Sequence, residues 1–561
     1  MAASAPELSI TRTPEIQTYK PTVFNQINEK ADEEKAEKGG STLEKVHLTA
    51  WRLHLVTLGV CCSVFLPSFE ITVVSTALVD IADDLRAFSR VGWVIVAYLA
   101  AYTSMIIISA KMSDIIGRKT ALVASLIVFS AFSGGCGGAQ TLTQLIVLRA
   151  FQGVGGAGCF SVASIVVFEM VPKQMYPKYS AIISAIVALA TLLGPILGGL
   201  ITEKSTWRWV FLVNVPVGVT TTALLGICLP TGFPYQGQKS APNQIQNSLV
   251  QNLRRMDFLG TFLFMGASFT FVTALLEAST SFSWSSAPTI VLLVISGVLA
   301  IAFLAWERFI MQRSSLQEPI FPWRFVYNRA WMGMLFSSLL LGIPFAVLVV
   351  SIPQKLQTIS NLSPLQAGLR LLPYALSAPS GASLSNILIS RRKSLPPVYI
   401  TILGSCIQLI GISLLTVYSS ENGTTGRDYG CQIVAGFGLG MMFGTLVMLT
   451  PLSVDMQDLA TATGAIVQFR IFGSTIGLSI ATSVLNAKLR AELPRMLSPE
   501  KLEAVLRSTT VIHKLPGNVR SVVEDVFGEG YALQLKVVVA FAAVNVLTTC
   551  MVWRKKPVKV A

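Results

Sequence analysis

The chain has 561 residues, of which 52% are hydrophobic and 13% are charged, and its mean hydropathy is +0.62. Soluble globular proteins carry about 25% charged residues, so this composition leaves too little polar surface for a water-soluble fold and favours a membrane protein. The net charge of +14 would suggest nucleic acid as the partner of a soluble protein, but here many Lys and Arg residues lie in short segments between apolar runs. We therefore expect the lipid bilayer, and no nucleic acid, to be the partner.

The chain begins with a polar segment, residues 1–47, whose charges concentrate between Glu29 and Lys38. Such a composition cannot bury enough apolar surface to fold alone, so it predicts a disordered cytosolic tail. No cleavable signal peptide is expected, and residues 554–561 form a second, basic tail.

Fourteen long apolar runs follow the first tail. A spanning helix needs about 20 mostly apolar residues, and in lipid only helices and closed barrels satisfy the backbone. Because these runs are long and do not alternate in polarity, they predict an all-α polytopic membrane protein. The expected spans are 54–80, 92–112, 119–139, 144–168, 179–201, 208–230, 257–277, 288–308, 331–353, 366–388, 396–418, 430–451, 461–485 and 532–553.

The basic residues set the expected orientation, because cytosolic loops carry an excess of Lys and Arg. With a cytosolic N-terminus, the even-to-odd loops are inside and hold most of the loop cations, including Arg118, Lys119, Arg391 and Arg392. This bias predicts that both termini are cytosolic. The sequon at Asn422 then lies outside, where glycosylation is expected.

The loop after the second span combines an acid, a glycine and a basic cluster: Asp114, Gly117, Arg118 and Lys119. Gly117 allows a tight turn. Asp114 caps a helix start or pairs with a basic residue, which would give a gating latch that forms in one conformation and breaks in another. The alternative is an ordinary positive-inside loop.

Two further motifs lie inside spans. Arg149 is a charge within the fourth span, which points to a function, and it is followed by a glycine-rich run that includes Gly153. In the fifth span, Pro195 favours a bend beside a face of small residues. These residues are Gly194, Gly198 and Gly199. A plain helix-packing face is the alternative interpretation of that motif.

The loop at 110–119 resembles the signature G-x-L-x-D-R-x-G-R-K of the major facilitator superfamily, with departures at Ala110, Met112 and Ile115 that predict a weaker latch. The fifth-span motif resembles the one that marks antiporters in that superfamily. Within the first span, the segment from Phe69 to Leu78 is similar to the L-D-x-T-I-V-x-x-A-L pattern of fourteen-span drug:proton antiporters, with Glu70 where that family usually has Asp. Segments 207–216 and 363–368 resemble its later motifs, and the nearest likeness is to fungal toxin and multidrug efflux proteins.

This resemblance implies two six-helix bundles plus two extra helices. The expected parts are an N-terminal bundle at 48–230, a cytosolic loop at 231–256, the extra pair at 257–310, a cytosolic loop at 311–329, and a C-terminal bundle at 330–553 with an external loop at 487–530. The bundles would rock about a midplane site. The resemblance further implies a monomer that exchanges protons for a small organic substrate. Its expected location is the plasma membrane, or alternatively the vacuolar membrane.

Glu70 and Arg149 are the expected proton-coupling residues. Burial disfavours the carboxylate form of Glu70, and a nearby cation favours it, so opening to one side or the other would bind or release a proton. A static structural pair is the alternative. Candidates for the substrate cavity are Tyr98, Tyr102, Gln152, Phe345, Gln354, Tyr374, Gln468 and Arg470.

Other function classes lack their motifs. The sequence has no G-x-x-x-x-G-K-[ST], so we expect no nucleotide. Three histidines and cysteines without paired spacing predict no metal, no cofactor and no enzyme. The remaining alternatives are export of a siderophore, amino acid or polyamine, or a non-transporting sensor with the same fold.

Overall fold

The structure is a computed structural model, which describes residues 50–85, 91–234, 257–280, 283–312, 317, 319–390, 395–418, 426–455, 458–498, 501, 505, 512 and 515–553. The expected tails at 1–47 and 554–561, most of the loop at 231–256 and the sequon residue Asn422 lie outside these residues. Every regular element within them is a helix, which confirms the expected all-α class.

The first six spans of the sequence form one helical bundle. The sixth span carries two helix labels that only Val213 separates, and because Val213 has helical backbone angles the span continues through it. The helices are α2 (Ala50–Asp84), α3 (Trp93–Ile116), α4 (Arg118–Gly138), α5 (Leu142–Glu169), α6 (Tyr176–Lys204), α7 (Arg208–Leu212) and α8 (Asn214–Cys228), with a short 3-10 turn η2 (Lys173–Met175) before α6.

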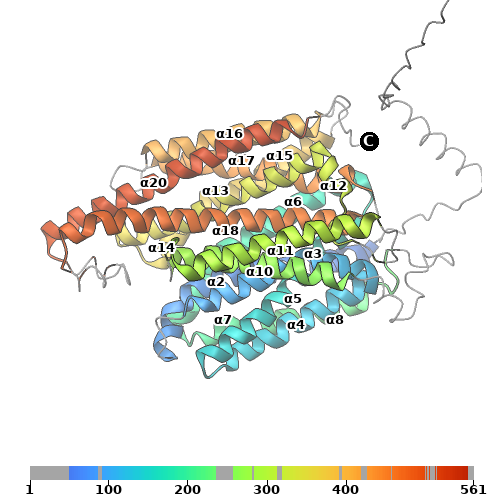
Figure 1. Cartoon of the computed structure of the whole chain (residues 1–561), viewed down its shortest axis with the longest axis horizontal. Helices are drawn as coiled ribbons and strands as arrows, with labels where there is room; N and C mark the ends of the chain where they lie inside the picture. The colour runs from blue at the N-terminus through green and yellow to red at the C-terminus, as the bar shows by residue number, and fades with distance from the viewer. Residues whose placement is uncertain are drawn as a thin grey trace, which may run out of the picture. The chain divides into compact units, whose positions relative to one another are not determined.

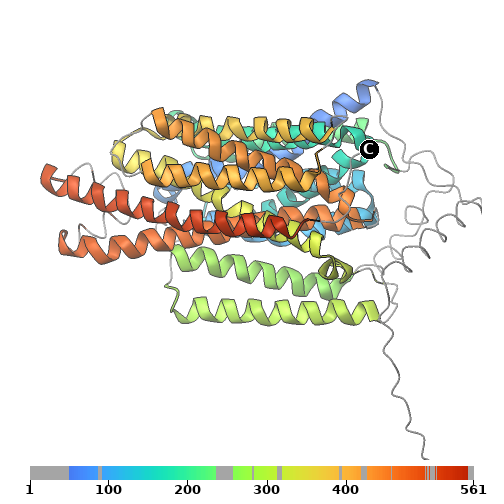
Figure 2. The same cartoon turned by 90° about the horizontal axis from the view of Figure 1, so that it is seen from above.

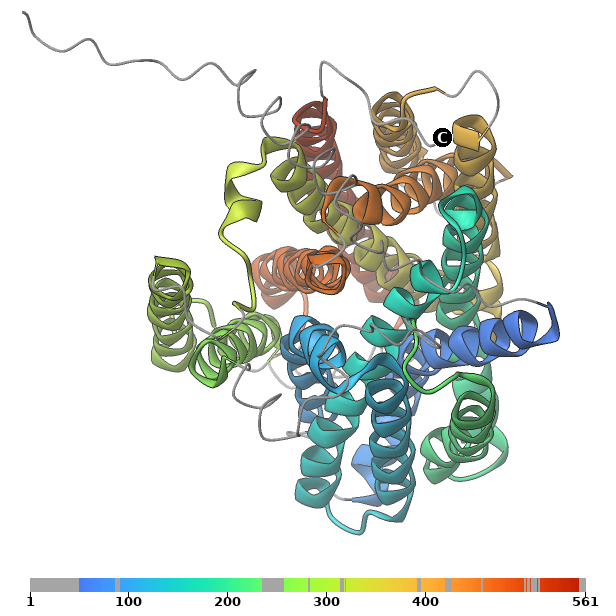
Figure 3. The ribbon, with the colours of Figure 1, turned by 90° about the vertical axis from the view of Figure 1, so that its right-hand side faces the viewer.

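The last six spans form the second bundle. Its tenth-span segment begins with a short helix that Ser363 and Gln366 cap reciprocally. The helices are α12 (Arg324–Tyr327), α13 (Arg329–Ser360), α14 (Pro364–Leu369), α15 (Leu372–Ser390), α16 (Pro397–Tyr418), α17 (Gly426–Ser453), α18 (Leu459–Glu492), η4 (Leu493–Arg495) and α20 (Gly517–Cys550). Seen along the helices, the blue-to-green first bundle lies beside the yellow-to-red second bundle, and α6 of the first packs on α15 and α17 of the second (Figure 3).

The extra pair, α10 (Phe258–Thr280) and α11 (Ala287–Gln312), stands beside the two bundles (Figures 2 and 3). Of the two, α10 packs on α3 and α18, one helix from each bundle, whereas α11 packs on α10. Many side chains of α11 are exposed, as a helix that faces lipid requires. The pair therefore adjoins a seam between the bundles without entering either one.

Thirteen of the described helices are long and apolar enough to cross a membrane. The predicted span at 366–388 corresponds to α15, which is not among the thirteen. Its sequence is rich in serine and contains Pro379. α15 packs on α17 and on α6 of the other bundle, so its polar residues are accommodated by protein neighbours (Figure 1).

The predicted outer loop at 487–530 is shorter than the sequence suggested, because helices continue into it from both sides. α18 extends to Glu492 and α20 begins at Gly517. Apolar side chains at helical spacing on the two extensions pack together, and Lys488 of α18 pairs with Glu529 of α20 at 2.7 Å. The predicted loop boundaries were wrong because a hydropathy scan does not detect an apolar stripe on a helix that is otherwise polar.

Candidate functional site

A buried ion pair lies inside the first bundle, between α2 and α5. Glu70 is completely buried, and Arg149 is 1% exposed. The Arg149 guanidinium donates from Nη1 to Glu70 Oε1, so the two residues expected to couple protons are in direct contact. An ion pair at this depth loses the hydration of both charges, and it persists only where additional hydrogen bonds compensate.

Residues of neighbouring helices form further hydrogen bonds with this ion pair. Arg149 also donates from Nε to the Val94 carbonyl at 3.1 Å and from Nη1 to Gln152 Oε1 at 2.9 Å. The ring of Tyr98 lies 4.2 Å from the guanidinium carbon. The guanidinium is therefore held in one orientation by α3 and α5, with its charge directed at the carboxyl of α2.

Asn214 is a member of this site that the sequence analysis did not assign. Its Nδ2 donates to Glu70 Oε2 at 2.5 Å, so the carboxyl accepts one hydrogen bond on each oxygen. Asn214 is buried at the start of α8, where the chain has just left α7. The position is part of the 207–216 segment noted for its family likeness, and an amide side chain within an apolar run was the available sequence signal.

The loop between α3 and α4 forms a second buried ion-pair cluster. Gly117 has φ +91°, a left-handed conformation that favours glycine, and it lets α4 begin directly after α3 ends. Arg118 donates from Nε and Nη2 to the two carboxylate oxygens of Glu169 at 2.9 and 3.0 Å, and its Nη2 pairs with Asp114 Oδ1 at 2.5 Å. Lys119 is half-buried and pairs with none of the described residues.

This cluster joins three helices of the same bundle, since Asp114, Arg118 and Glu169 belong to α3, α4 and α5. Of the two roles expected for Asp114, the structure shows pairing with a basic residue. Glu169 was not anticipated, although an acid at the end of an apolar helix is a recognisable signal. These contacts hold together adjacent ends of three helices of the first bundle.

The small residues of the fifth-span motif lie where α6 crosses α2. A side chain at Gly194 would meet Thr72, and one at Gly198 would meet Thr76 and the Val73 carbonyl. Helix α6 continues through Pro195, and Gly199 is half-buried. Gly153 serves the crossing of α5 with α3, where a Cβ would meet the backbone of Tyr98 and Tyr102. These contacts are those of close helix packing.

A cavity of about 420 Å³, called here the central cavity, lies between the bundles. One wall is α6, and the others are α13, α15, α17 and α18 of the second bundle. Its lining residues are Ser184, Val187, Ala188, Leu341, Phe345, Ala378, Leu439, Gly440, Phe443 and Arg470. A smaller cavity of about 320 Å³ shares Phe443 with it and extends between α5, α6, α17 and α18.

Two of the eight predicted cavity residues, Phe345 and Arg470, line the central cavity. Tyr98 and Tyr102 are fully buried in the first bundle and stack on each other with ring centroids 5.7 Å apart. This tyrosine pair lies beside Arg149, through the contact of Tyr98 with its guanidinium.

The other four predicted cavity residues lie elsewhere. Gln152 is fully buried in the Glu70 network, where its Nε2 donates to Ser133 at 3.0 Å. Gln468 accepts a hydrogen bond from the Ile107 amide at 3.3 Å and so joins α18 to α3. Tyr374 is buried in the core of the second bundle, and Gln354 is exposed on α13. Amide and aromatic side chains within a span pack against other helices at some positions and line a cavity at others. Residue type alone therefore does not distinguish the two roles.

Comparison with known proteins assigns the family. The family model described as Major Facilitator Superfamily matches residues 60–316. The chain is 37% identical to the MFS-type transporter FPY5 of Fusarium mangiferae, over 92% of this chain and 86% of that protein. The chain belongs to the major facilitator superfamily. It is also 30% identical to the efflux pump FUS6 of Gibberella moniliformis, over 79% of this chain and 76% of that protein.

Solved structures of the superfamily share the fold. A bacterial homolog of the human lysosomal transporter Spinster, in an inward-facing and unoccupied conformation, matches with a TM-score of 0.56 at 13% identity, covering 91% of this chain and all of that chain. The proton:xylose symporter XylE matches with a TM-score of 0.53 at 11% identity, covering 87% of this chain and 94% of that chain. At these identities the likeness shows the fold alone.

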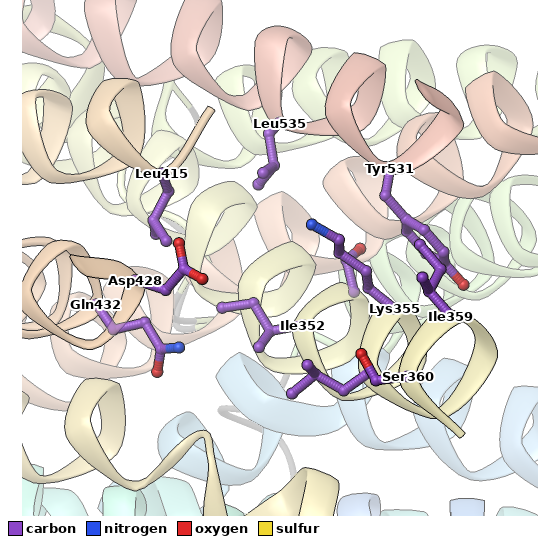
Figure 4. A pocket seen from close by; sticks show the side chains of 11 residues that line it. Ile352, Lys355, Ile359, Ser360, Leu415, Asp428, Gln432, Tyr531 and Leu535 are labelled. Carbon is purple, nitrogen blue, oxygen red and sulfur yellow. The ribbon is translucent and has the colours of Figure 1, made fainter. Parts of the chain in front are cut away.

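This major facilitator transporter has a further cavity of about 630 Å³ within its second bundle, called here the outer cavity (Figure 4). Lys355 and Ile359 of α13 face Asp428 and Gln432 of α17 across it, and Tyr531 of α20 closes one side. All of its walls come from the second bundle. A substrate site for rocking bundles lies between the two halves, so the central cavity suits that role and the outer cavity does not.

Proposed function

We propose that this transporter exports small organic compounds from the cell in exchange for protons, with the two bundles rocking about the central cavity. The observation that carries the proposal is the buried contact between Glu70 and Arg149, since an intramembrane acid persists only when it is paired and is typical of proton relays. The relatives named as efflux pumps support export as the direction.

The chemistry follows from two opposing effects on Glu70. Its burial disfavours the carboxylate, whereas Arg149 and Asn214 favour it by donating to both oxygens. A conformational change that admits water, or that moves the guanidinium, alters this balance. Glu70 would therefore take a proton in one state of the cycle and release it in the other.

The central cavity supports an organic cargo. Most of its lining is apolar, as is usual for small-molecule sites. Because both bundles contribute walls, rocking would expose it to each side in turn. We further propose a monomer in the plasma membrane with both termini in the cytosol, as the loop cations indicate.

The first experiment identifies the cargo. A deletion strain is compared with strains that carry the wild-type gene, the Glu70→Gln variant or the Glu203→Gln variant, and compounds retained in the cells are measured. Glu203 is an exposed glutamate at the end of α6 and serves as the matched control. We expect Glu203→Gln to restore export and Glu70→Gln to leave the compound inside.

The second experiment uses purified protein in liposomes with that compound. Under an imposed pH gradient the wild type should concentrate the compound, whereas Glu70→Gln should exchange it across the membrane but not concentrate it. A Glu70→Gln variant that still concentrates the compound as the wild type does would show a static pair. Loss of exchange as well as accumulation would also favour the structural role.

A further inference from the structure

Arg470 is a buried cation that no described residue compensates. It lies in α18, is 8% exposed, and forms neither a side-chain hydrogen bond nor an ion pair within the described part of the chain. Its Nε is fully enclosed without an acceptor. Removing an ion from water costs several kcal/mol unless a partner compensates, so an arginine in this condition requires an explanation.

Arg149 provides an internal comparison. Both arginines lie inside spans and are at least nine-tenths buried, but Arg149 has a carboxylate, an amide oxygen and a carbonyl as acceptors. Among the described residues, one intramembrane guanidinium thus has three acceptors and the other has none. Arg470 differs further in that it lines the central cavity.

The neighbours of Arg470 do not replace an anion. Its guanidinium carbon lies 5.8 Å from the ring centroid of Phe345 and 5.2 Å from that of Phe443. Contacts of a guanidinium with aromatic rings recover only part of the hydration free energy that is lost on burial. The rings contact the guanidinium but supply no hydrogen-bond acceptor to its N–H donors.

The rest of the central cavity favours an apolar ligand body. Arg470 is the one charged side chain among the residues that line it, and Val187, Leu341 and Leu439 are among the others. A cationic ligand would be repelled by Arg470, and a neutral one would supply acceptors but leave the positive charge uncompensated. A ligand with an acidic group would pair with the guanidinium through two parallel hydrogen bonds, the geometry in which arginine binds carboxylates.

We infer that the central cavity binds an amphipathic organic anion, with its acidic group on Arg470 and its apolar body against Phe345, Phe443 and the aliphatic lining. The claim that this anion is the exported cargo rests on the proposed function, whereas the binding itself does not. The inference therefore specifies the substrate class: weak organic acids with an apolar skeleton.

The test measures binding of three fluorescent probes that share one body: 1-pyrenebutyrate, its methyl ester, and the corresponding trimethylammonium compound. Full-length protein in detergent is titrated with each probe. The wild type should bind the carboxylate about tenfold or more tightly than the ester, as one charge-assisted pair predicts, and should bind the cation most weakly. Arg470→Gln should bind the acid and the ester alike, and Arg470→Lys should retain part of the preference.

Arg490→Gln is the matched control, because this exposed arginine lies on the same helix, outside the cavity lining. It should keep the preference of the wild type. The affinity ratio in the wild type is decisive even if Arg470→Gln does not fold. Equal binding of acid and ester by the wild type, no binding of any probe, or a preference that survives in Arg470→Gln would each overturn the inference.

The binding test of the anion site and the transport test of proton coupling can fail independently of each other. Binding in detergent needs no pH gradient, so an Arg470-dependent preference for the acid supports the anion site even if Glu70→Gln transports normally. Conversely, proton-driven export with no preference for the acid would refute the anion site and leave the proposed function intact.

Discussion

The geometry of the Arg118–Glu169 ion pair predicts how much its loss lowers the free energy of unfolding. Two parallel hydrogen bonds of 2.9 and 3.0 Å join side chains that are 8% and 4% exposed. Arg118→Gln would leave the Glu169 and Asp114 carboxylates close together without their cation, at a cost of about 3–5 kcal/mol in the free energy of unfolding. Glu169→Gln should cost less, about 1–2 kcal/mol, because Arg118 keeps Asp114.

The double variant should lose about 1–2 kcal/mol less than the sum of the single variants, because the contact can be lost only once. The assay is reversible unfolding of the purified protein by SDS titration in mixed micelles. Arg520→Gln is the control: Arg520 pairs with Glu524 one turn away on α20 at 2.7 Å, and their side chains are 37% and 20% exposed, so less than about 1 kcal/mol should be lost. Strict additivity, or an Arg118→Gln loss no larger than the control, would refute the reasoning.

Three further predictions concern the bundle interior. Asn214→Ala removes one donor to Glu70, so proton-driven accumulation in liposomes should weaken more than substrate exchange does; equal losses would indicate a packing defect. Gly198→Ala places a Cβ against α2 and should lower the free energy of unfolding by about 1–3 kcal/mol, whereas Gly226→Ala, with open space around it, should be neutral. Tyr102→Phe keeps the ring that stacks on Tyr98, so the amount of substrate accumulated per proton should not change. Tyr102→Leu removes the ring and should lower that ratio. A ratio that is unchanged in Tyr102→Leu would contradict a role for the stack in coupling.

The sequence predicted the features that depend on local pattern. Hydropathy located the helices, and the charge of Arg149 inside an apolar run marked it as exceptional. The turn at Gly117 also follows from residue type, because a positive φ favours glycine. These signals are local: each is contained within about one helix or one turn.

The features that the sequence did not predict depend on contacts between distant segments. Asn214 reaches Glu70 from 144 positions along the chain, and Glu169 reaches Arg118 from 51. Gln152 was expected in the substrate cavity because an amide in a span suits a ligand, but its neighbours Arg149 and Ser133 use both of its polar atoms. Residue type showed that these side chains needed partners, and only the fold identifies which partners they have.

An anion site at Arg470 and a proton site at Glu70 together determine the charge moved by each cycle. If one monoanion leaves the cell for each proton that enters, two positive charges move inward in net terms, whereas a neutral cargo would move one and a monovalent cation none. A potential of 100 mV, inside negative, then contributes about 4.6 kcal/mol to export of the anion, at about 2.3 kcal/mol per charge. In liposomes without a pH gradient, a potassium diffusion potential set by valinomycin should therefore drive uphill transport of a weak organic acid. Arg470→Gln should abolish that transport without affecting passive leak. If the potential has no effect on wild-type transport of the acid, the two sites do not operate together in this way.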